Sequence, residues 1–482
     1  MGSVQKSLLL FSSCVCLLGY HAPPADATIN INLLEFVVRG NETSNAGALN
    51  AVFDKGEEDL RTKYGSLFNI TRSRFYDRNG ATDCSHLEQT ATLWATRMYC
   101  GNVHENSVMA VFGPSCPAAT AMISYLAKEW NIPTFSGLGL GLSGGTGALD
   151  RTRYSTLTRV SDIMDADMNQ FIYKVLTAFG YHTVVLLCDD DNDDDLYTTM
   201  CMSVVDALRH YGLTTDRSHQ FTVNRFYIQA DDRANIRHYL QDSSDVARVI
   251  LIFAPASHVR SIMLAAFDKN MTGEEYVYFA VQPAGDITWY SEKDAGRNED
   301  ARTAFRSLFI MSPRVKETPE YQNFSKEVQR LSTEKYNYVF SPGEQVNPVA
   351  VSYYYALDMY SQVLNETITN GDNPNDGAAL SQRMRNRTYT VLGRDITINV
   401  NGDTSSDWLL SQMNSTGNFT SVMEYSARQR ILQPSRDPVD NSIRRIVWPN
   451  NRTAPSPDEP RCGYRGLKLE CQTPIGKLLP MQ

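Results

Sequence analysis

Runs of apolar residues alternate with stretches of helical periodicity along most of the chain. The first run, "TININLLEFVVRG", predicts a strand, and "GALNAVFDKGEEDLRTKYG" predicts a helix with Leu49, Val52, Phe53 and Leu60 on its apolar face. Strands at "SLFNITRSRFYD", "SVMAVFGPSC" and "NIPTFSG" follow, separated by helices at "SHLEQTATLWATRMYC" and "PAATAMISYLAKEW". Continuous apolar strands between helices indicate a parallel sheet that is covered on both faces.

A second series of the same kind follows. Helix "ADMNQFIYKVLTAFG", strand "HTVVLLC" and helix "YTTMCMSVVDALRHYG" precede "RVILIFAPASHVRSIMLAAFDKNMTGEEYVYFAV", which reads as a strand, a helix and a strand. Two such series predict an α/β protein with two doubly wound lobes. Ligands of such sheets lie outside the carboxyl ends of the strands.

Two details of the pattern are specific enough to check. In "PAATAMISYLAKEW", Pro117 suits the first helical position, and Ala121, Met122, Tyr125 and Leu126 share one face. Further on, two helices precede "GRDITINVNGDTSSDWLLSQM", whose alternation predicts a hairpin with "NGD" at its turn and a second strand that runs on through "NFTSVMEYS".

The end of the chain has a different composition. Beyond Trp448, "PNNRTAPSPDEP" is rich in proline and polar residues, which predicts an extended linker that does not pack. It leads to "RCGYRGLKLEC", in which Cys462 and Cys471 enclose eight residues close to the last residue.

The first 27 residues have the composition of a secretory signal. Lys6 gives a positive start, "SLLLFSSCVCLLG" is an apolar core of signal length, and "ADA" predicts cleavage before Thr28. No later segment has the roughly 20 apolar residues of a membrane span. We therefore expect a secreted chain, or the ectodomain of a plasma-membrane receptor if the sequence is truncated.

Charge and sequons add to this picture. The net charge of −9 argues against a nucleic-acid partner, which requires a basic surface. Nine N-x-S/T sequons behind a signal peptide predict a glycosylated ectodomain. They lie at Asn41, Asn69, Asn270, Asn323, Asn365, Asn386, Asn414, Asn418 and Asn451.

Seven cysteines remain once the signal is removed. An odd number in an oxidising compartment leaves one thiol unpaired or bonded to another chain. Disulfides are favoured over a metal site, because the sequence has no CxxC pair, HExxH motif or close Cys/His cluster. The seven are Cys84, Cys100, Cys116, Cys188, Cys201, Cys462 and Cys471.

Two glycine-rich matches to enzyme motifs lack the surroundings that the chemistry requires. "GLGLSG", from Gly139 to Gly144, fits a dinucleotide fingerprint but precedes a non-helical segment. "GLSGG" offers Ser143 as a nucleophile, but the catalytic triad of such a hydrolase needs a histidine late in the chain. No histidine follows His258, which lies far from the end of the chain. A loop lining an interlobe cleft is the better interpretation.

The acidic run "CDDDNDDD", from Cys188 to Asp195, is the strongest charge cluster. It lacks the glycine and glutamate that a calcium loop of the EF type carries at its sixth and twelfth positions. We interpret the run as a solvated loop at the end of a strand, with calcium binding as the alternative.

"VFGPSCPAATA" is the better candidate for an anion site. A tight turn at Gly113 and Pro114 directs the backbone N–H groups of Ser115 and Cys116 into a helix N-terminus, an arrangement that binds small anions. A plain strand-to-helix turn explains the same residues equally well.

Together these residues resemble the extracellular ligand-binding region of the receptor guanylate cyclases, and in pattern the natriuretic peptide receptors above all. The resemblance covers nearly all of Thr28 to Cys471 and rests on "VFGPSCPAATAMISYLAKEWNIPTFSG", "SQRMRNRTYTVLGRDITINVNGD" and "RCGYRGLKLEC". The last is the most specific, because the family carries a similar cysteine loop just outside its membrane span. The family's membrane helix, kinase-like domain and cyclase domain are absent from this sequence.

The resemblance implies a type I periplasmic-binding-protein fold with three interlobe crossings, and a homodimer. The expected parts are lobe 1 at 28–160 and 314–388, lobe 2 at 161–313 and 389–448, a linker at 449–461, the juxtamembrane-type loop at 462–471 and a tail at 472–482.

The resemblance also implies disulfides Cys84–Cys116 and Cys462–Cys471. This sequence departs from the family at the middle disulfide, because Cys201 matches one of the two bonded cysteines but Phe253 stands at the position of the other. Cys188 is the natural substitute, which leaves Cys100 as the odd thiol. A Cys84–Cys100 bridge is the competing arrangement.

The site residues follow from the resemblance in the same way. The family's chloride site uses the two amides after Gly-Pro, here those of Ser115 and Cys116, and a hydroxyl at a position that carries Asp77. A carboxylate there would repel chloride, so no cofactor is expected. Peptide contacts would fall at His86, Ala118, Tyr125, Met202 and Asp206, where most of the family's aromatic and arginine anchors are missing.

We therefore predict a binding module and not an enzyme. It would capture an extracellular peptide other than a mammalian-type natriuretic peptide and, in a full receptor, transmit binding through the terminal loop to a membrane segment that is absent from this sequence. The alternatives are a small ligand, such as an amino acid, held in the interlobe cleft by Ser136 and Ser143, and a secreted hydrolase using Ser143.

Overall fold

The computed structural model describes residues 28–37, 46–75, 84–102, 107–138, 141, 150–190, 195–214, 220–229, 233–273, 275–283, 287–340, 345–448 and 452–471. The chain divides into two compact units. The described residues of unit 1 fall within 28–142, 149–162 and 316–405, and those of unit 2 within 163–315 and 406–471. The signal peptide and the tail, predicted from the sequence, lie outside the described residues.

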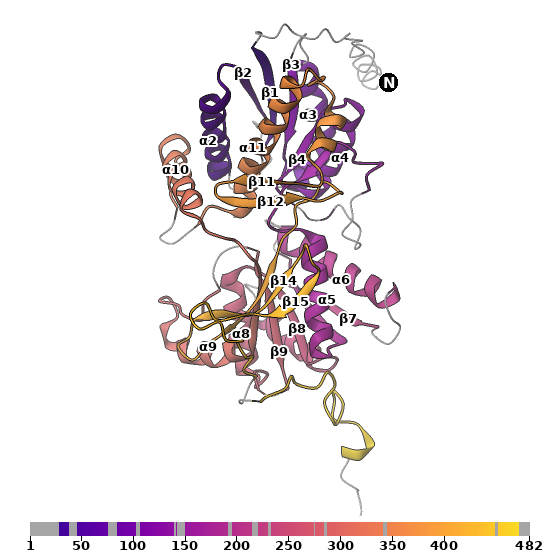
Figure 1. The fold of residues 1–482 in the computed structure, drawn as a ribbon. Helices are drawn as coiled ribbons and strands as arrows, with labels where there is room; N and C mark the ends of the chain where they lie inside the picture. Colours follow the sequence, from indigo (N-terminus) through magenta and orange to yellow (C-terminus); the bar gives the residue numbers. More distant parts are fainter. Residues whose placement is uncertain are drawn as a thin grey trace, which may run out of the picture. The chain divides into compact units, whose positions relative to one another are not determined.

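Unit 1 contains a five-stranded parallel sheet in the order β2-β1-β3-β4-β5. Its strands are β1 (Ile29–Phe36), β2 (Phe68–Phe75), β3 (Ser107–Phe112), β4 (Thr134–Ser136) and β5 (Leu157–Arg159). The helices between them are α2 (Ala46–Tyr64), α3 (Cys84–Asn102) and α4 (Pro117–Glu129), and α10 (Pro319–Tyr336), α11 (Pro348–Thr369) and α12 (Gly377–Met384) come later in the chain. Helices cover both faces of this sheet (Figure 1).

The core of unit 1 confirms the apolar face predicted for the first helix. Leu49, Val52, Phe53 and Leu60 are all buried. Phe53 of α2 packs edge-on against Phe112 of β3 and lies 5.5 Å from the ring of Tyr353 of α11, centroid to centroid. The sheet is therefore buried from both sides, as continuous apolar strands require.

Unit 2 contains an eight-stranded sheet in the order β15-β14-β13-β10-β9-β8-β6-β7. Strands β6 (Thr183–Asp189), β7 (Thr222–Ile228), β8 (Val249–Phe253), β9 (Val277–Val281) and β10 (Leu308–Pro313) are parallel, and β13 (Trp408–Met413), β14 (Phe419–Ser426) and β15 (Ile431–Pro434) add antiparallel strands. Its helices are α5 (Asp165–Phe179), α6 (Asp195–Thr214), α7 (Arg233–Ser244), α8 (Ala256–Asp268) and α9 (Asn298–Ala304).

The turn predicted at "NGD" is present, with the Asn399 N–H donating to the Asp403 carbonyl at 2.8 Å and Ile398 bridged antiparallel to Thr404, but the strand predicted to pair after it is wrong. The structure forms one hairpin from β11 (Arg387–Val391) and β12 (Arg394–Ile398), and β13 pairs with β14 instead of with β12. The "NGD" segment is held by Arg159, whose Nε and Nη2 donate to the two carboxylate oxygens of Asp403 at 2.8 and 2.9 Å. A buried bidentate ion pair therefore fixes this segment beside β5.

The described chain passes between the units near three positions: after Asp162, Val315 and Ser405. The first two lie within two residues of the boundaries expected from the sequence. The third lies after Ser405 and not after residue 388, because the β11–β12 hairpin and the Asp403 segment both belong to unit 1.

A network of buried charges joins β1, β2 and α2 in unit 1. The side chain of Glu35 is fully buried and accepts hydrogen bonds from Arg72 Nη2 at 2.9 Å and Arg74 Nε at 3.2 Å. Asp54 accepts from both arginines, at 2.6 and 2.5 Å. Buried carboxylates are tolerated where cations and hydrogen bonds compensate for lost hydration, and these two meet that condition.

Candidate functional site

The first turns of α3 and α4 in unit 1 are held together by a disulfide. Cys84, the first residue of α3, is bonded to Cys116, the residue before α4, with the Cα atoms 5.4 Å apart. His86 and Ala118 each lie two residues further along their helices; His86 is half-buried and Ala118 is exposed. The Cys84–Cys100 alternative is therefore wrong.

The exposed face of α4 carries two large apolar side chains. Pro117 occupies the first helical position, as predicted. The buried residues of α4 are mostly small and include Ala119 and Ala127, whereas Met122 is 44% exposed and Tyr125 is 47% exposed. Large apolar side chains on a solvent-exposed helix face indicate a contact surface.

Unit 2 has a compact cluster of side chains on α6 and β7. Met202 and Asp206 lie four residues apart on α6, so they share one helix face. The Sδ atom of Met202 contacts the guanidinium of Arg225 and lies 3.2 Å from the hydroxyl of Tyr227. Arg225 in turn stacks over the Tyr227 ring, 4.8 Å from its centroid. We call these four residues the α6–β7 cluster.

Sequence reasoning identified Met202 and Asp206 but not Arg225 and Tyr227. The two missed residues lie two apart on β7, so they point to the same face of the strand. Tyr227 is exposed and Arg225 is half-buried. Arginine and tyrosine are the residue types most enriched among energetically dominant interface contacts.

A second disulfide fixes α6 to the sheet beside this cluster. Cys188, on β6, is bonded to Cys201, on α6, with the Cα atoms 5.9 Å apart. In the parallel pairing of β6 with β8, Cys188 is the register partner of Phe253. Cys188 therefore bonds to Cys201 from β6, the strand beside β8, and Phe253 occupies the neighbouring position on β8.

The Gly113–Pro114 turn packs against the end of β1 and against α11. The Gly113–Pro114 peptide is cis, and Gly113 has φ of +90°, where an added Cβ would lie 2.5 Å from the Phe36 carbonyl oxygen. The Ser115 hydroxyl lies 3.3 Å from the Tyr353 hydroxyl, and burial raises the pKa of Tyr353. Asp77 lies outside the described residues, so the anion site stays a prediction.

The first carboxylate of the acidic run is buried, contrary to the expected solvated loop. Asp189 ends β6, and its Oδ2 lies 2.6 Å from Nδ1 of His258 at the start of α8. Asp190 is exposed, and positions 191–194 lie outside the described residues. Among the residues that the structure describes, no group of three or more metal-ligating side chains is present.

Of the two hydroxyl groups proposed for a small ligand, the structure describes that of Ser136. Ser136 is buried, and its Oγ donates to the Leu138 carbonyl at 2.9 Å, so its hydrogen is already used. Ser143 and most of the glycine-rich segment lie outside the described residues.

The terminal cysteine loop is docked on unit 2. Cys462 is bonded to Cys471. The segment before it does not behave as an unpacked linker, because Asp458 Oδ1 accepts the backbone N–H groups of His182 and Thr183, each at 3.0 Å, at the start of β6. The pairing of Cys100, expected to be the odd thiol of the mature chain, stays a prediction, because the three disulfides among the described cysteines join the other six.

The described sequon asparagines lie mainly at the surface. Asn41 and Asn451 are outside the described residues, and Asn365 is half-buried. The exposed ones are Asn69, Asn270, Asn323, Asn386, Asn414 and Asn418. Across the part of the chain that the structure describes, no helix has the length and hydropathy needed to cross a bilayer.

Comparison with known proteins agrees with the two-unit architecture. Residues 81–416 match the family model described as "Receptor family ligand binding region". The receptor-type guanylate cyclase gcy-28 of Caenorhabditis elegans is 26% identical over 426 residues, which cover 77% of this chain and 33% of the relative.

Two rat proteins show the same relationship. Atrial natriuretic peptide receptor 2 of Rattus norvegicus is 23% identical over 384 residues, covering 76% of this chain and 34% of that protein. Atrial natriuretic peptide receptor 3 of Rattus norvegicus is 28% identical over 312 residues, covering 64% and 55%. The chain thus spans between about a third and about half of the length of these curated relatives.

Proposed function

The chain belongs to the receptor family ligand-binding region, which has the type I periplasmic-binding-protein fold, and on this premise we propose that it is the extracellular part of a peptide receptor. Relatives of this chain are named as natriuretic peptide receptors and as a receptor-type guanylate cyclase. The proposed role is to bind a peptide and to perform no chemistry on it.

The α6–β7 cluster is the observation that carries the proposal. It presents an arginine, a tyrosine and a methionine together, and the exposed Asp206 lies four residues from Met202 on the same helix. The cluster is held rigidly, because Cys201 ties α6 to β6 directly beside Met202. Rigid aromatic and arginine anchors bind with a small loss of conformational entropy, which suits the capture of a flexible peptide.

The ligand is proposed to differ from a mammalian-type natriuretic peptide. Ala118, Tyr125 and Met202 stand where the resemblance implies a tyrosine, an arginine and a phenylalanine. Truncating anchors of these types costs about 2 kcal/mol or more each. Arg225 and Tyr227 would supply replacement anchors from β7.

Dimerisation is proposed through unit 1. Met122, Tyr125 and Leu93 are each more than two-fifths exposed on α4 and α3. A two-fold interface uses the same patch on both subunits, so one apolar helix face is sufficient to build it. The terminal loop, docked at the start of β6, would then carry the effect of binding towards the rest of a full receptor.

Affinity selection with a displayed peptide library tests the proposal. The secreted chain is immobilised, bound peptides are enriched, and their dissociation constants are measured for the wild type and for Tyr227→Ala and Arg225→Ala. Loss of a hot-spot anchor is expected to weaken binding by about tenfold or more, since about 1.4 kcal/mol corresponds to tenfold.

Arg237→Ala is the matched control, because Arg237 is an exposed arginine of the same unit that pairs with Asp268. Its binding should equal that of the wild type. A failure to enrich any peptide, or enriched peptides whose affinity is unchanged by both cluster variants, would overturn the proposal. Turnover that disappears in Ser143→Ala would point to a hydrolase instead.

A further inference from the structure

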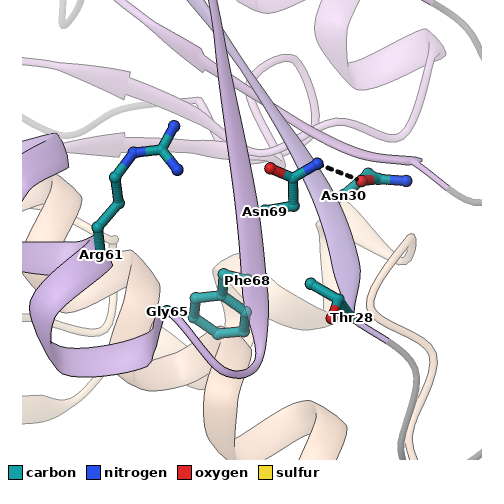
Figure 2. A pocket seen from close by; sticks show the side chains of 6 residues that line it. All are labelled: Thr28, Asn30, Arg61, Gly65, Phe68 and Asn69. Carbon is teal, nitrogen blue, oxygen red and sulfur yellow. Dashed lines mark hydrogen bonds between the residues drawn. The ribbon is translucent and has the colours of Figure 1, made fainter.

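Unit 1 has an open hollow of about 560 Å³ at the start of β1 and β2. It is lined by side chains from both strands and from the end of α2: Thr28, Asn30, Arg61, Gly65, Phe68 and Asn69 (Figure 2). One lining residue, Asn69, is the asparagine of the sequon "NIT".

Asn69 is held in place within the hollow. It lies on the edge strand β2 in register with Asn30 of β1, and its Nδ2 donates to Asn30 Oδ1 at 2.8 Å. Both side chains are exposed. An asparagine amide carries two hydrogens on nitrogen, so attachment of one sugar leaves the second hydrogen available for this same hydrogen bond.

Arg61 supplies donors beside Asn69. Its Nε donates to Glu57 Oε1 at 2.9 Å, and its Nη2 donates to the Ile70 carbonyl of β2 at 2.6 Å. A guanidinium has five N–H groups, so further donors remain at this rim of the hollow. Hydroxyl and acetamido groups of a sugar are hydrogen-bonding partners that such a rim accommodates.

We propose that the hollow is the seat of an N-glycan on Asn69, with the innermost sugar held by Asn30 and Arg61. The Asn69 Nδ2 forms a bond to C1 of the first N-acetylglucosamine of a lipid-pyrophosphate-linked oligosaccharide. The C1–O bond breaks, the lipid pyrophosphate leaves with the electron pair, and Nδ2 releases one proton to the transferring enzyme. The seated glycan covers the open edge of β2, where unpaired backbone groups would otherwise invite association.

Native deglycosylation of the secreted full chain tests the proposal. Glycopeptide mass spectrometry first measures the occupancy of Asn69 and Asn323. A peptide:N-glycosidase time course on the folded protein then compares the release rates at the two sites. Asn323 is the internal control, because it lies exposed on α10 and does not line this hollow. Release at Asn69 is expected to be about tenfold slower, equal to about 1.4 kcal/mol of seating free energy.

Asn30→Ala provides the second arm. It keeps the sequon but removes the acceptor for Asn69 Nδ2, so release at Asn69 should approach the Asn323 rate. Thr71→Ala removes the sequon without touching the lining and should raise amide exchange in β2, whereas Thr71→Ser should not. An unmodified Asn69 in the secreted wild type, or equal release rates at Asn69 and Asn323, overturns the proposal even if a variant is not secreted.

Discussion

Arg248 donates a hydrogen bond from Nη2 to the main-chain carbonyl of Tyr464 at 2.9 Å. Its guanidinium also lies 5.5 Å from the centroid of the Tyr464 ring. Arg248 directly precedes β8, and Tyr464 lies inside the loop that the Cys462–Cys471 disulfide closes. The terminal loop is therefore bound to the amino-terminal ends of two central strands of unit 2, since Asp458 binds the start of β6 in the same region.

Removal of the Asp458 carboxylate should release this docking. Asp458→Ala leaves the N–H groups of His182 and Thr183 without their charged acceptor, and such hydrogen bonds contribute about 1.5–3 kcal/mol. We expect faster amide exchange in residues 452–471 by mass spectrometry, with the thermal unfolding of the sheets little changed. Arg465→Ala removes only a more exposed ion pair to Asp245 and is the control. Unchanged exchange in Asp458→Ala would show that the loop is held by other contacts.

The Cys188–Cys201 disulfide should stabilise the folded protein mainly by lowering the conformational entropy of the unfolded chain. The two cysteines are 13 residues apart, and closing a loop of about 15 residues lowers the free energy of folding by about 3 kcal/mol in the chain-entropy model. The double variant Cys188→Ser with Cys201→Ser should lose about this much in urea unfolding.

A relocated cysteine tests the geometry of the same bridge. Because Cys188 and Phe253 are register partners, Cys188→Ser combined with Phe253→Cys should restore a disulfide to Cys201 from β8. Non-reducing peptide mapping detects the new pair. Alkylation of Cys188 and Cys201 in the native wild type would contradict the assignment.

The periodicity of apolar residues was sufficient to predict the helices and strands that bury a continuous apolar stripe. The four predicted core positions of α2 are buried because helix spacing alone places them on one face. The same reasoning grouped Ala121, Met122, Tyr125 and Leu126 on α4, where Met122 and Tyr125 are exposed and Ala121 and Leu126 are half-buried. The buried side of α4 instead carries the fully buried Ile123 between small residues such as Ala119 and Ala127.

Contacts between residues far apart in the chain explain the features that could not be predicted from the sequence. The strand after the "NGD" turn was misassigned, because Asp403 is held by Arg159, 244 residues away in the chain, and β13 pairs with β14. Strand β7 was not recognised, since most of its residues are half-buried, and with it the sequence analysis missed Arg225 and Tyr227. A side chain at a candidate site is found from sequence only when its own element gives a clear pattern.

Asp54 should make the stability of unit 1 sensitive to acid. Burial opposes ionisation of this carboxyl group, but hydrogen bonds from Arg72, Lys335 and Tyr336 outweigh it and lower the pKa from 3.8 to about 2. The unfolded chain therefore takes up the proton first as pH falls. The stabilisation is fully present above about pH 4 and is lost between about pH 4 and 2.

Asp54→Asn tests this dependence. The variant should be less stable at neutral pH by about 1.5–3 kcal/mol, because hydrogen bonds to a charged acceptor are lost. Its unfolding free energy, measured in urea between pH 6 and 2, should fall less steeply below pH 4 than that of the wild type. Glu35 does not interfere in this pH range. Burial raises the pKa of Glu35 above 4.5, so its contribution to the unfolding free energy changes at higher pH. If the unfolding free energy fell equally steeply below pH 4 in the two proteins, the prediction would be contradicted.

The exposed face of α4 should control self-association. Tyr125→Asp places a carboxylate in the middle of a face formed with Met122, and at a two-fold interface the charge would be introduced twice. Burial of an unpaired charge is costly, and charged residues are depleted at interface cores, so the dimer should dissociate. Sedimentation velocity at micromolar concentration should give a dimer for the wild type and a monomer for Tyr125→Asp. Gln322→Asp adds the same charge to exposed α10 and should remain dimeric. A monomeric wild type would contradict the proposed dimer, and a Tyr125→Asp variant that stays dimeric would place the association surface on other residues.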